Sequence, residues 1–394
     1  PNAMVFKNLN LIANGIKLKD ETANITIEKA TFHETSGINL NALQLSLNAT
    51  DNSLKITDFK TALNNNQLSA SVALKYPEIS ALIESPEKAK ANLNVPSFKV
   101  ALQDLFLVQP ELKNNNYFNT LSKKPLKGSI KASGILSAIN LNDITASWGN
   151  TTQISAQGTI ANVTQQDSLQ FNVFNFIAET TRTDVSKFIN ETDFGVRLPE
   201  ALKISGSVTG NLNNITTNTK LTTSQGDATI NGYFKSEETL AFKTDISVEK
   251  YELDQLLQNE QLGAISLSLH ADGKGKTINN LDATFKTNIS SFKYNNYNIK
   301  DLNINGDIKN GNGTITSSYK DYNLNIDLNA EVDLDSVAPQ AQIALNIEGA
   351  DLQALGLMER NIKTGMKINA NFKGNSTNYS IKANVNEGVM VYDN

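Results

Sequence analysis

The segment Asn323–Asp335 reads NLNIDLNAEVDLD. Apolar side chains occupy every second position from Leu324 to Leu334, and the intervening positions are Asn, Asp or Glu. A period of two residues is that of a β-strand, because successive side chains point to opposite faces of a sheet. The segment therefore predicts a strand with one apolar and one polar face, and it raises the question of what covers the apolar face.

The same alternation recurs along most of the chain. Examples are LQLSLNATDNSLKI (43–56), LNINGDIKNGNGTITSS (302–318) and IALNIEGA (343–350). Pairs such as Asn310-Gly311 between these segments favour tight hairpin turns. The pattern predicts an all-β, mainly antiparallel protein with a few short helices.

Two short elements repeat in this background. Four strand-like stretches end in glycine and keep apolar residues or glycine at their odd positions: LKGSIKASG (126–134), LKISGSVTG (202–210), ISLSLHADG (265–273) and MKINANFKG (366–374). Each is preceded by an acid with two apolar residues three positions apart: DLFLV (104–108), DVSKF (184–188), ELDQL (252–256) and DLQAL (351–355).

The second element predicts a short helix in each repeat. The acids Asp104, Asp184, Glu252 and Asp351 suit a helix start, where a carboxylate meets free backbone N–H groups. The pairs that form an apolar stripe are Leu105/Val108, Val185/Phe188, Leu253/Leu256 and Leu352/Leu355. We predict one elongated assembly of repeats over residues 1–394, with approximate units 1–97, 98–178, 179–247, 248–346 and 347–394.

The composition excludes several classes of function. The chain has 394 residues with 35 basic and 40 acidic side chains, a formal net charge of -5 and no basic block, so no nucleic-acid partner is expected. It has no cysteine, which excludes a thiol redox site, a thiolate metal site and a disulfide framework.

No motif predicts catalysis or metal binding. His33 and His270 lack a second ligand nearby and are expected to be solvated strand residues. GKGKT (273–277) lacks the leading glycine of a phosphate-binding loop and is interpreted as a hairpin turn. The carboxylates of Asp327–Asp335 are more typical of a solubilising strand face than of a calcium site. We therefore predict that the protein is not an enzyme and has no catalytic residue, bound metal or cofactor.

The apolar face needs a cover that the sequence does not supply. Four short helices are too few to cover so many strands, and a two-sheet sandwich has a limited number of strands with aromatic anchors. This chain continues the same aliphatic pattern with 7% aromatic residues and a single Trp148, which is either a core residue or a groove residue. The sequence predicts an elongated, curled sheet that forms a repeating hydrophobic β-groove.

These features resemble the AsmA/TamB-like family of double-membraned bacteria, in particular the TamB-type translocation and assembly module proteins. The resemblance rests on the short helix followed by a strand of the form L-x-G-x-[IV]-x-x-x-G, which LKGSIKASG (126–134) fits, and on the unbroken alternation over most of the chain. LKISGSVTG (202–210) departs from that form, because Ile204 and Gly206 exchange positions. The start PNAM is interpreted as a cloning remnant, and the chain as an internal fragment of a longer protein.

The resemblance implies a periplasmic groove that transfers lipids between the inner and outer membranes and contributes to outer-membrane biogenesis. It implies acyl chains, with phospholipid as the expected lipid, as ligands. It also implies a parent protein anchored in the inner membrane, and an outer-membrane assembly protein contacted by a region outside this fragment. The groove-lining residues expected on this basis are Ile265, Leu267, Leu269, Leu324, Ile326, Leu328, Val332, Ile343, Leu345, Ile347, Ile368 and Phe372.

The sequence leaves other interpretations open. The main alternative is a structural or adhesive β-repeat protein of the cell surface, whose apolar face is closed by packing against itself. A sugar-active β-helix enzyme is the weakest candidate, because no clustered pair of carboxylates is evident. Bound lipid distinguishes the first two, since a closed core has no room for acyl chains.

Overall fold

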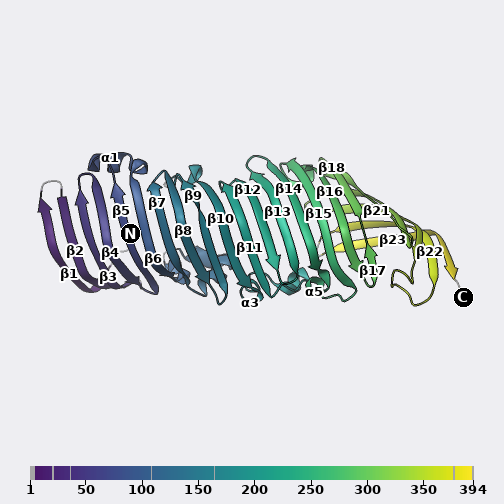
Figure 1. Cartoon of the computed structure of the whole chain (residues 1–394), viewed down its shortest axis with the longest axis horizontal. Helices are drawn as coiled ribbons and strands as arrows, with labels where there is room; N and C mark the ends of the chain where they lie inside the picture. Colours follow the sequence, from purple (N-terminus) through teal and green to yellow (C-terminus); the bar gives the residue numbers. More distant parts are fainter. Residues whose placement is uncertain are drawn as a thin grey trace. The chain divides into compact units, whose positions relative to one another are not determined.

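The computed structural model describes residues 5–19, 22–35, 37–107, 109–163, 165–375 and 378–392 (Figure 1). The chain forms two compact units. Unit 1 contains Pro1–Asn190 and Glu200–Leu212, and unit 2 contains Glu191–Pro199 and Asn213–Asn394. The five predicted repeats are a finer division than this one and stay a prediction.

Unit 1 is an antiparallel meander in which each strand pairs with the next along the chain. Its strands are β1 (Phe6–Lys19), β2 (Thr22–Glu34), β3 (Asn39–Thr50), β4 (Ser53–Leu63), β5 (Asn66–Lys75), β6 (Lys90–Val100), β7 (Leu126–Ile135), β8 (Ala138–Trp148), β9 (Thr152–Ala161), β10 (Gln170–Thr181) and β11 (Ala201–Gly210).

Unit 2 repeats this arrangement, with β17 as a short extra strand beside β16. Its strands are β12 (Asn214–Thr223), β13 (Gly226–Ser236), β14 (Leu240–Glu252), β15 (Leu262–Gly275), β16 (Asp282–Tyr294), β17 (Tyr297–Ile299), β18 (Leu302–Lys309), β19 (Asn312–Lys320), β20 (Leu324–Asp333), β21 (Gln340–Asp351), β22 (Ile362–Gly374) and β23 (Tyr379–Tyr392). The stretch NLNIDLNAEVDLD thus forms β20. GKGKT, predicted to be a hairpin turn, forms the end of β15 and the start of its connection to β16, and that connection contains a short 3-10 helix.

The helices are short and lie in the connections between strands. Unit 1 has α1 (Ile79–Glu84), η1 (Pro86–Lys88), η2 (Leu102–Leu107), η3 (Pro110–Asn114), α2 (Asn116–Ser122), η4 (Gln166–Ser168) and α3 (Arg182–Val185). Unit 2 has α4 (Glu191–Phe194), α5 (Leu253–Leu257) and η5 (Ile278–Asn280). The predicted fold class is confirmed: the protein is mainly antiparallel β, and in each unit the sheet is curled and open, with a few short helices.

The four predicted helices are realised only in part. DVSKF and ELDQL overlap α3 and α5, and DLFLV begins within the 3-10 helix η2, while Val108 of the predicted apolar stripe lies outside the described residues. DLQAL is a turn after β21 and not a helix. Its Asp351 accepts a hydrogen bond from the Ala354 backbone N–H at 3.0 Å, but Gly356 then adopts a φ of +71°, which ends any helical path.

Two of the predicted capping acids instead hold a neighbouring hairpin. Asp184 is 1% exposed, and its carboxylate accepts hydrogen bonds from the backbone N–H groups of Asn150, Thr151 and Thr152 at 2.9, 2.8 and 3.1 Å, in the turn between β8 and β9. Lys187 Nζ lies 2.5 Å from the same carboxylate. Burial raises the pKa of Asp184, but the hydrogen bonds from Lys187 and the turn outweigh it and hold that pKa far below its usual value.

Asp104 has the same role one repeat earlier. Its Oδ2 accepts from the Asn65 backbone N–H at 3.2 Å and from Asn66 Nδ2 at 2.7 Å, in the turn between β4 and β5. The backbone N–H groups of these turns have no partner in the β-ladder. A carboxylate from a later connection that accepts their hydrogen bonds therefore stabilises the turn more than it would stabilise the first turn of its own short helix. The prediction of helix caps at Asp104 and Asp184 is therefore corrected.

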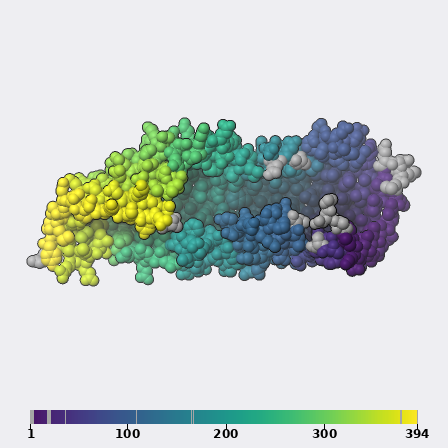
Figure 2. Space-filling model, turned by 180° about the vertical axis from the view of Figure 1, so that it is seen from behind, coloured from purple at the N-terminus to yellow at the C-terminus, as the bar shows by residue number. Residues whose placement is uncertain are grey.

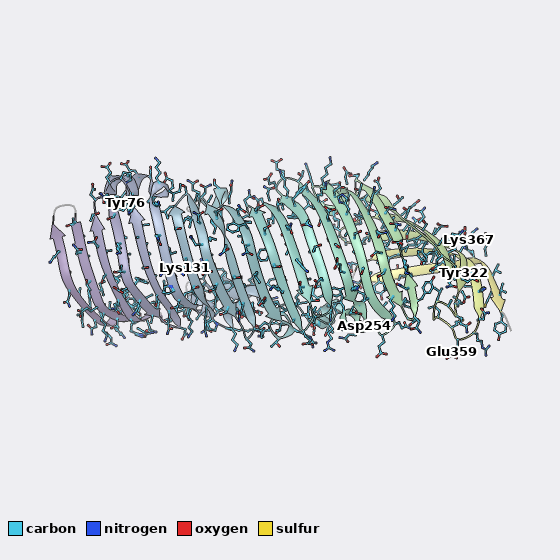
Figure 3. The ribbon with its side chains drawn as sticks, viewed as in Figure 1. Tyr76, Lys131, Asp254, Tyr322, Glu359 and Lys367 are labelled. Atoms are coloured by element: carbon cyan, nitrogen blue, oxygen red, sulfur yellow. The ribbon has the colours of Figure 1, made fainter. Side chains whose placement is uncertain are left out.

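The best-packed residues lie at the ends of the strands. In unit 1, Trp148 is 5% exposed, donates from Nε1 to the Leu121 carbonyl at 2.8 Å, and its ring lies 5.1 Å from that of Phe188. Trp148 is thus a core residue. Tyr76 is also buried, at the end of β5 and shortly before α1 (Figure 3), and its hydroxyl donates to the Thr50 carbonyl at 3.0 Å.

Unit 2 has an equivalent cluster of Tyr297, Ala350 and Leu355 at the turn after β21. Beside it, Asp321 accepts hydrogen bonds from the hydroxyls of Tyr297 and Tyr319 and from the backbone N–H of Leu324. Burial raises the pKa of Asp321, but these hydrogen bonds outweigh that effect and lower the pKa below its usual value. Such clusters cover the apolar face at the ends of the strands. The apolar residues in the middle of the strands do not belong to these clusters.

Candidate functional site: the apolar face of the sheet

Cross-strand pairing arranges the apolar side chains of unit 2 in rows that run across the strands. The row that contains Leu328, here called the Leu328 row, is Ile246, Leu269, Thr287, Ile304, Ser317, Leu328, Leu345, Ile368 and Val385. The next position along the strands aligns Tyr319, Ile326, Ile347 and Met366. Because the side-chain period of a strand is two, all of these residues lie on one face.

The structure brings most of the predicted groove residues together. Leu324, Ile326, Leu328 and Val332 lie on β20, Ile343, Leu345 and Ile347 on β21, and Ile368 and Phe372 on β22, and these three strands are neighbours. Ile265, Leu267 and Leu269 lie on β15, which β16, β18 and β19 separate from β20. Leu269 nevertheless belongs to the Leu328 row.

The two faces differ in exposure. All twelve predicted residues are partly buried, while polar neighbours such as Asp327, Asn329 and Lys373 are exposed. Figure 2 views the protein from behind, and in each unit it shows a hollow between two raised edges. In unit 1 the blue helical segment 102–122 lies behind the sheet in Figure 1, and Trp148 on the apolar face bonds to Leu121 of that segment, so the apolar face carries the hollow.

The chain exposes more surface than compact folding of the same mass would leave. The accessible surface is 24050 Å² for a mass of 42.9 kDa. Two separate compact globules that share this mass would expose only about 18,000 Å². Within the described residues, short helices and turns pack on the ends of the apolar face, and the strands of each unit belong to one continuous sheet. In unit 2 the yellow C-terminal strands curl round and pass in front of part of the hollow (Figure 2). The face is an open apolar surface and not the interior of a sandwich.

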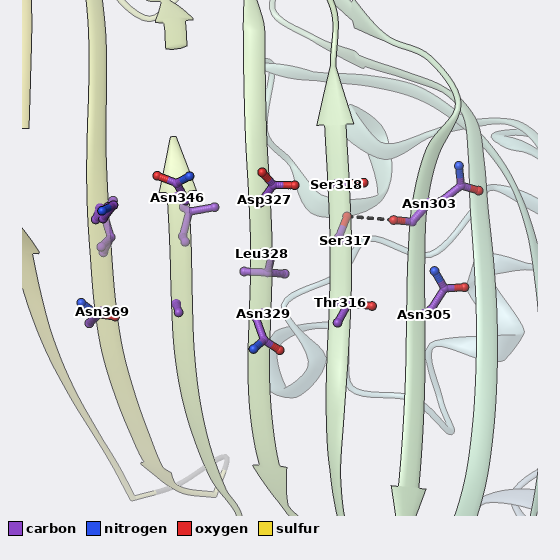
Figure 4. Close-up of a pocket in the computed structure, with 14 residues that line it drawn as sticks. Asn303, Asn305, Thr316, Ser317, Ser318, Asp327, Leu328, Asn329, Asn346 and Asn369 are labelled. Atoms are coloured by element: carbon purple, nitrogen blue, oxygen red, sulfur yellow. Dashed lines mark hydrogen bonds between the residues drawn. The ribbon is translucent and has the colours of Figure 1, made fainter. Parts of the chain in front are cut away.

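A second, polar depression lies on the opposite face of β18–β22 (Figure 4) and has a volume of about 420 Å³. Its polar lining consists of Asn303, Asn305, Thr316, Ser317, Ser318, Asp327, Asn329, Asn346, Lys367 and Asn369. Leu328, Leu345 and Ile368 also line it. Asp327 and Asn329 alternate with Leu328 along β20, so most of the lining residues belong to the polar face, while the backbone of the Leu328 row also borders the depression.

The described residues contain no group of three or more His, Asp or Glu side chains that could hold a metal ion. His270 lies on the polar face, with Nδ1 at 2.6 Å from Asp245 Oδ1, and His33 is exposed beside Asn39. In the part of the chain that the structure describes, no helix has the length and apolar character needed to cross a membrane.

Sequence reasoning included Phe372 but missed two other aromatic rings of the apolar face, Phe242 and Phe285. Phe242 pairs with Gly273 across β14 and β15, and Phe285 pairs with Gly306 across β16 and β18. The sequence does carry one signal for these rings, which is a glycine at an apolar position of a strand. Glycine inside a strand often marks the close approach of another group. The sequence does not show which phenylalanine approaches which glycine, because that depends on the pairing of strands.

Comparison with protein-family models, with curated proteins and with solved structures finds no match to this chain.

Proposed function

We propose that the protein is an AsmA/TamB-like lipid-transfer protein of the periplasm, whose apolar face carries phospholipid acyl chains between the inner and outer membranes. The observation that carries the proposal is the open apolar face, where aligned aliphatic side chains of one curled sheet remain partly exposed. An exposed apolar surface of this extent marks a binding surface in a soluble protein.

Acyl chains suit this surface energetically. Burying one methylene group is worth about 0.8 kcal/mol, so a chain of about 16 carbons gains roughly 13 kcal/mol over water. The rows cross many strands with similar side chains, as in Leu328, Leu345 and Ile368. Neighbouring positions along a row are then close in free energy, and a chain can move along the row with its headgroup in solvent.

A photo-cross-linking experiment tests the proposal. A photoreactive residue at Leu345, on the apolar face of β21, should cross-link to phospholipid supplied in vesicles. The matched control is Gln342 on the same strand, which is exposed and pairs with Glu331 on the polar face. We expect strong labelling at position 345 and background labelling at position 342.

Equal labelling at the two positions would contradict the proposal that one face carries lipid. A complete lack of labelling at position 345 in the folded protein would instead favour the structural or adhesive alternative, in which the apolar face packs against protein.

A further inference from the structure

Two glycines of unit 2 lie directly under phenylalanine rings. A Cβ atom built on Gly306 would lie 2.1 Å from Cε1 of Phe285, and one built on Gly273 would lie 2.7 Å from Cζ of Phe242. Real Cβ atoms essentially never come within 3.0 Å of another heavy atom. Each ring therefore rests against the glycine backbone in space that any other residue would fill.

The Phe285–Gly306 pair belongs to a row of mainly small side chains. This row, here called the Phe285 row, contains Gly232, Thr244, Ala271, Phe285, Gly306, Ile315, Ala330, Ile343, Ala370 and Ala383. The Leu328 row lies beside it, two residues or about 6.7 Å further along the strands, and contains mostly large aliphatic side chains. Small side chains next to large ones form a shallow trough across the strands.

Phe285 is the largest side chain in this trough. Its ring stays close to the sheet only because it lies over Gly306, which has no side chain. With any side chain at position 306, the ring must rotate away from the sheet, toward the open side of the apolar face. The protein backbone at Gly306 does not require glycine for its own conformation, because its φ is outside the left-handed region and all three closest atoms belong to the Phe285 ring. The glycine is thus explained by the ring above it.

We infer that the Phe285 row binds a single linear acyl chain across the strands, and that Gly306 is a positioning residue that keeps the Phe285 ring out of the path of that chain. This inference rests on the proposed function. It assigns the acyl chain to one row of the apolar face. The space for the chain in that row then depends on Gly306, because Gly306 lets the Phe285 ring lie close to the sheet. Gly273 has the same relation to Phe242 one row away.

The test places a photoreactive residue at Ile315, which is the neighbour of Gly306 in the row, and measures cross-linking to phospholipid from vesicles. We expect Gly306→Ala to reduce the yield at least tenfold. The double variant Gly306→Ala/Phe285→Ala should restore it, because the ring that obstructs the row is gone. The matched control is Gly349→Ala on β21, where an added Cβ meets nothing within 4 Å, and the yield should not change.

A second variant keeps the inference testable if Gly306→Ala lowers the melting temperature. Phe285→Trp leaves the glycine in place but enlarges the ring, and it should also reduce cross-linking at position 315. If the otherwise unchanged protein cross-links at position 315 and both variants cross-link equally well, the inference is overturned while the proposed function stands. If that protein takes up no phospholipid, both are overturned.

Discussion

Replacement of Ile343 by aspartate should slow the passage of lipid across unit 2 by more than a hundredfold while the protein stays folded. Ile343 lies on the apolar face of β21, between Ala330 and Ala370 of the Phe285 row. An acyl chain that passes an unpaired carboxylate must remove water from it, at a cost of roughly 3 kcal/mol or more. Since about 1.4 kcal/mol corresponds to a tenfold change in rate, the barrier rises by more than two orders of magnitude.

The matched control is Gln342→Leu, at the preceding residue of the same strand. Gln342 is exposed on the polar face, so its replacement should leave transfer unchanged. The measurement is transfer of phospholipid between donor and acceptor vesicles, with the melting temperature of each variant recorded alongside. Normal transfer by a well-folded Ile343→Asp variant would exclude movement along a continuous apolar row.

The second large effect concerns stability. Asp184→Ala should destabilise unit 1 by about 3–5 kcal/mol, because it removes a buried carboxylate that satisfies three backbone N–H groups and pairs with Lys187. Urea unfolding of the variant should show an earlier transition for unit 1. Asp167→Ala is the control, since Asp167 is exposed in η4 and should change little. Equal stability of the two variants would contradict this role of Asp184.

The stabilisation by Asp184 should also depend on pH. Its pKa is lower in the folded than in the unfolded protein, so its contribution is complete above the unfolded value of about 3.9 and is lost as the pH falls through the folded value. The difference in unfolding free energy between the unchanged protein and Asp184→Asn should therefore be constant from about pH 5 to 7 and shrink below about pH 4. A difference that stays constant in acid would show that the charge of Asp184 is not what stabilises the turn.

The strands were predictable from the sequence because apolar and polar residues alternate along a strand that is buried on one face. In β20 every second residue from Leu324 to Val332 is apolar, and from Ile326 to Asp333 the burial alternates in the same way. Asn325 is the exception: it is partly buried, beside a shift in the register with β21. The short helices were less predictable, because four or five residues carry too little periodicity to separate a helix from a turn. DLQAL has the same pattern as ELDQL, yet only the latter forms a helix.

The candidate site was predictable as a face but not as a set of rows. Alternation assigns Leu328 and Leu345 to one side of the sheet, but their alignment depends on the register between strands. That register shifts at bulges, for example between Val248 and Tyr251 in β14, and a bulge is not visible in the alternation of a single strand. For the same reason the pairing of Phe285 with Gly306 could not be predicted.

The most direct test of the central claim is mass spectrometry of solvent extracts from the purified, folded protein. An apolar face that carries acyl chains should retain phospholipid through purification in close to stoichiometric amounts, and Ile343→Asp should retain less. Extracts without any lipid, from protein whose circular dichroism and melting transition are those of a folded β-sheet, would contradict the account.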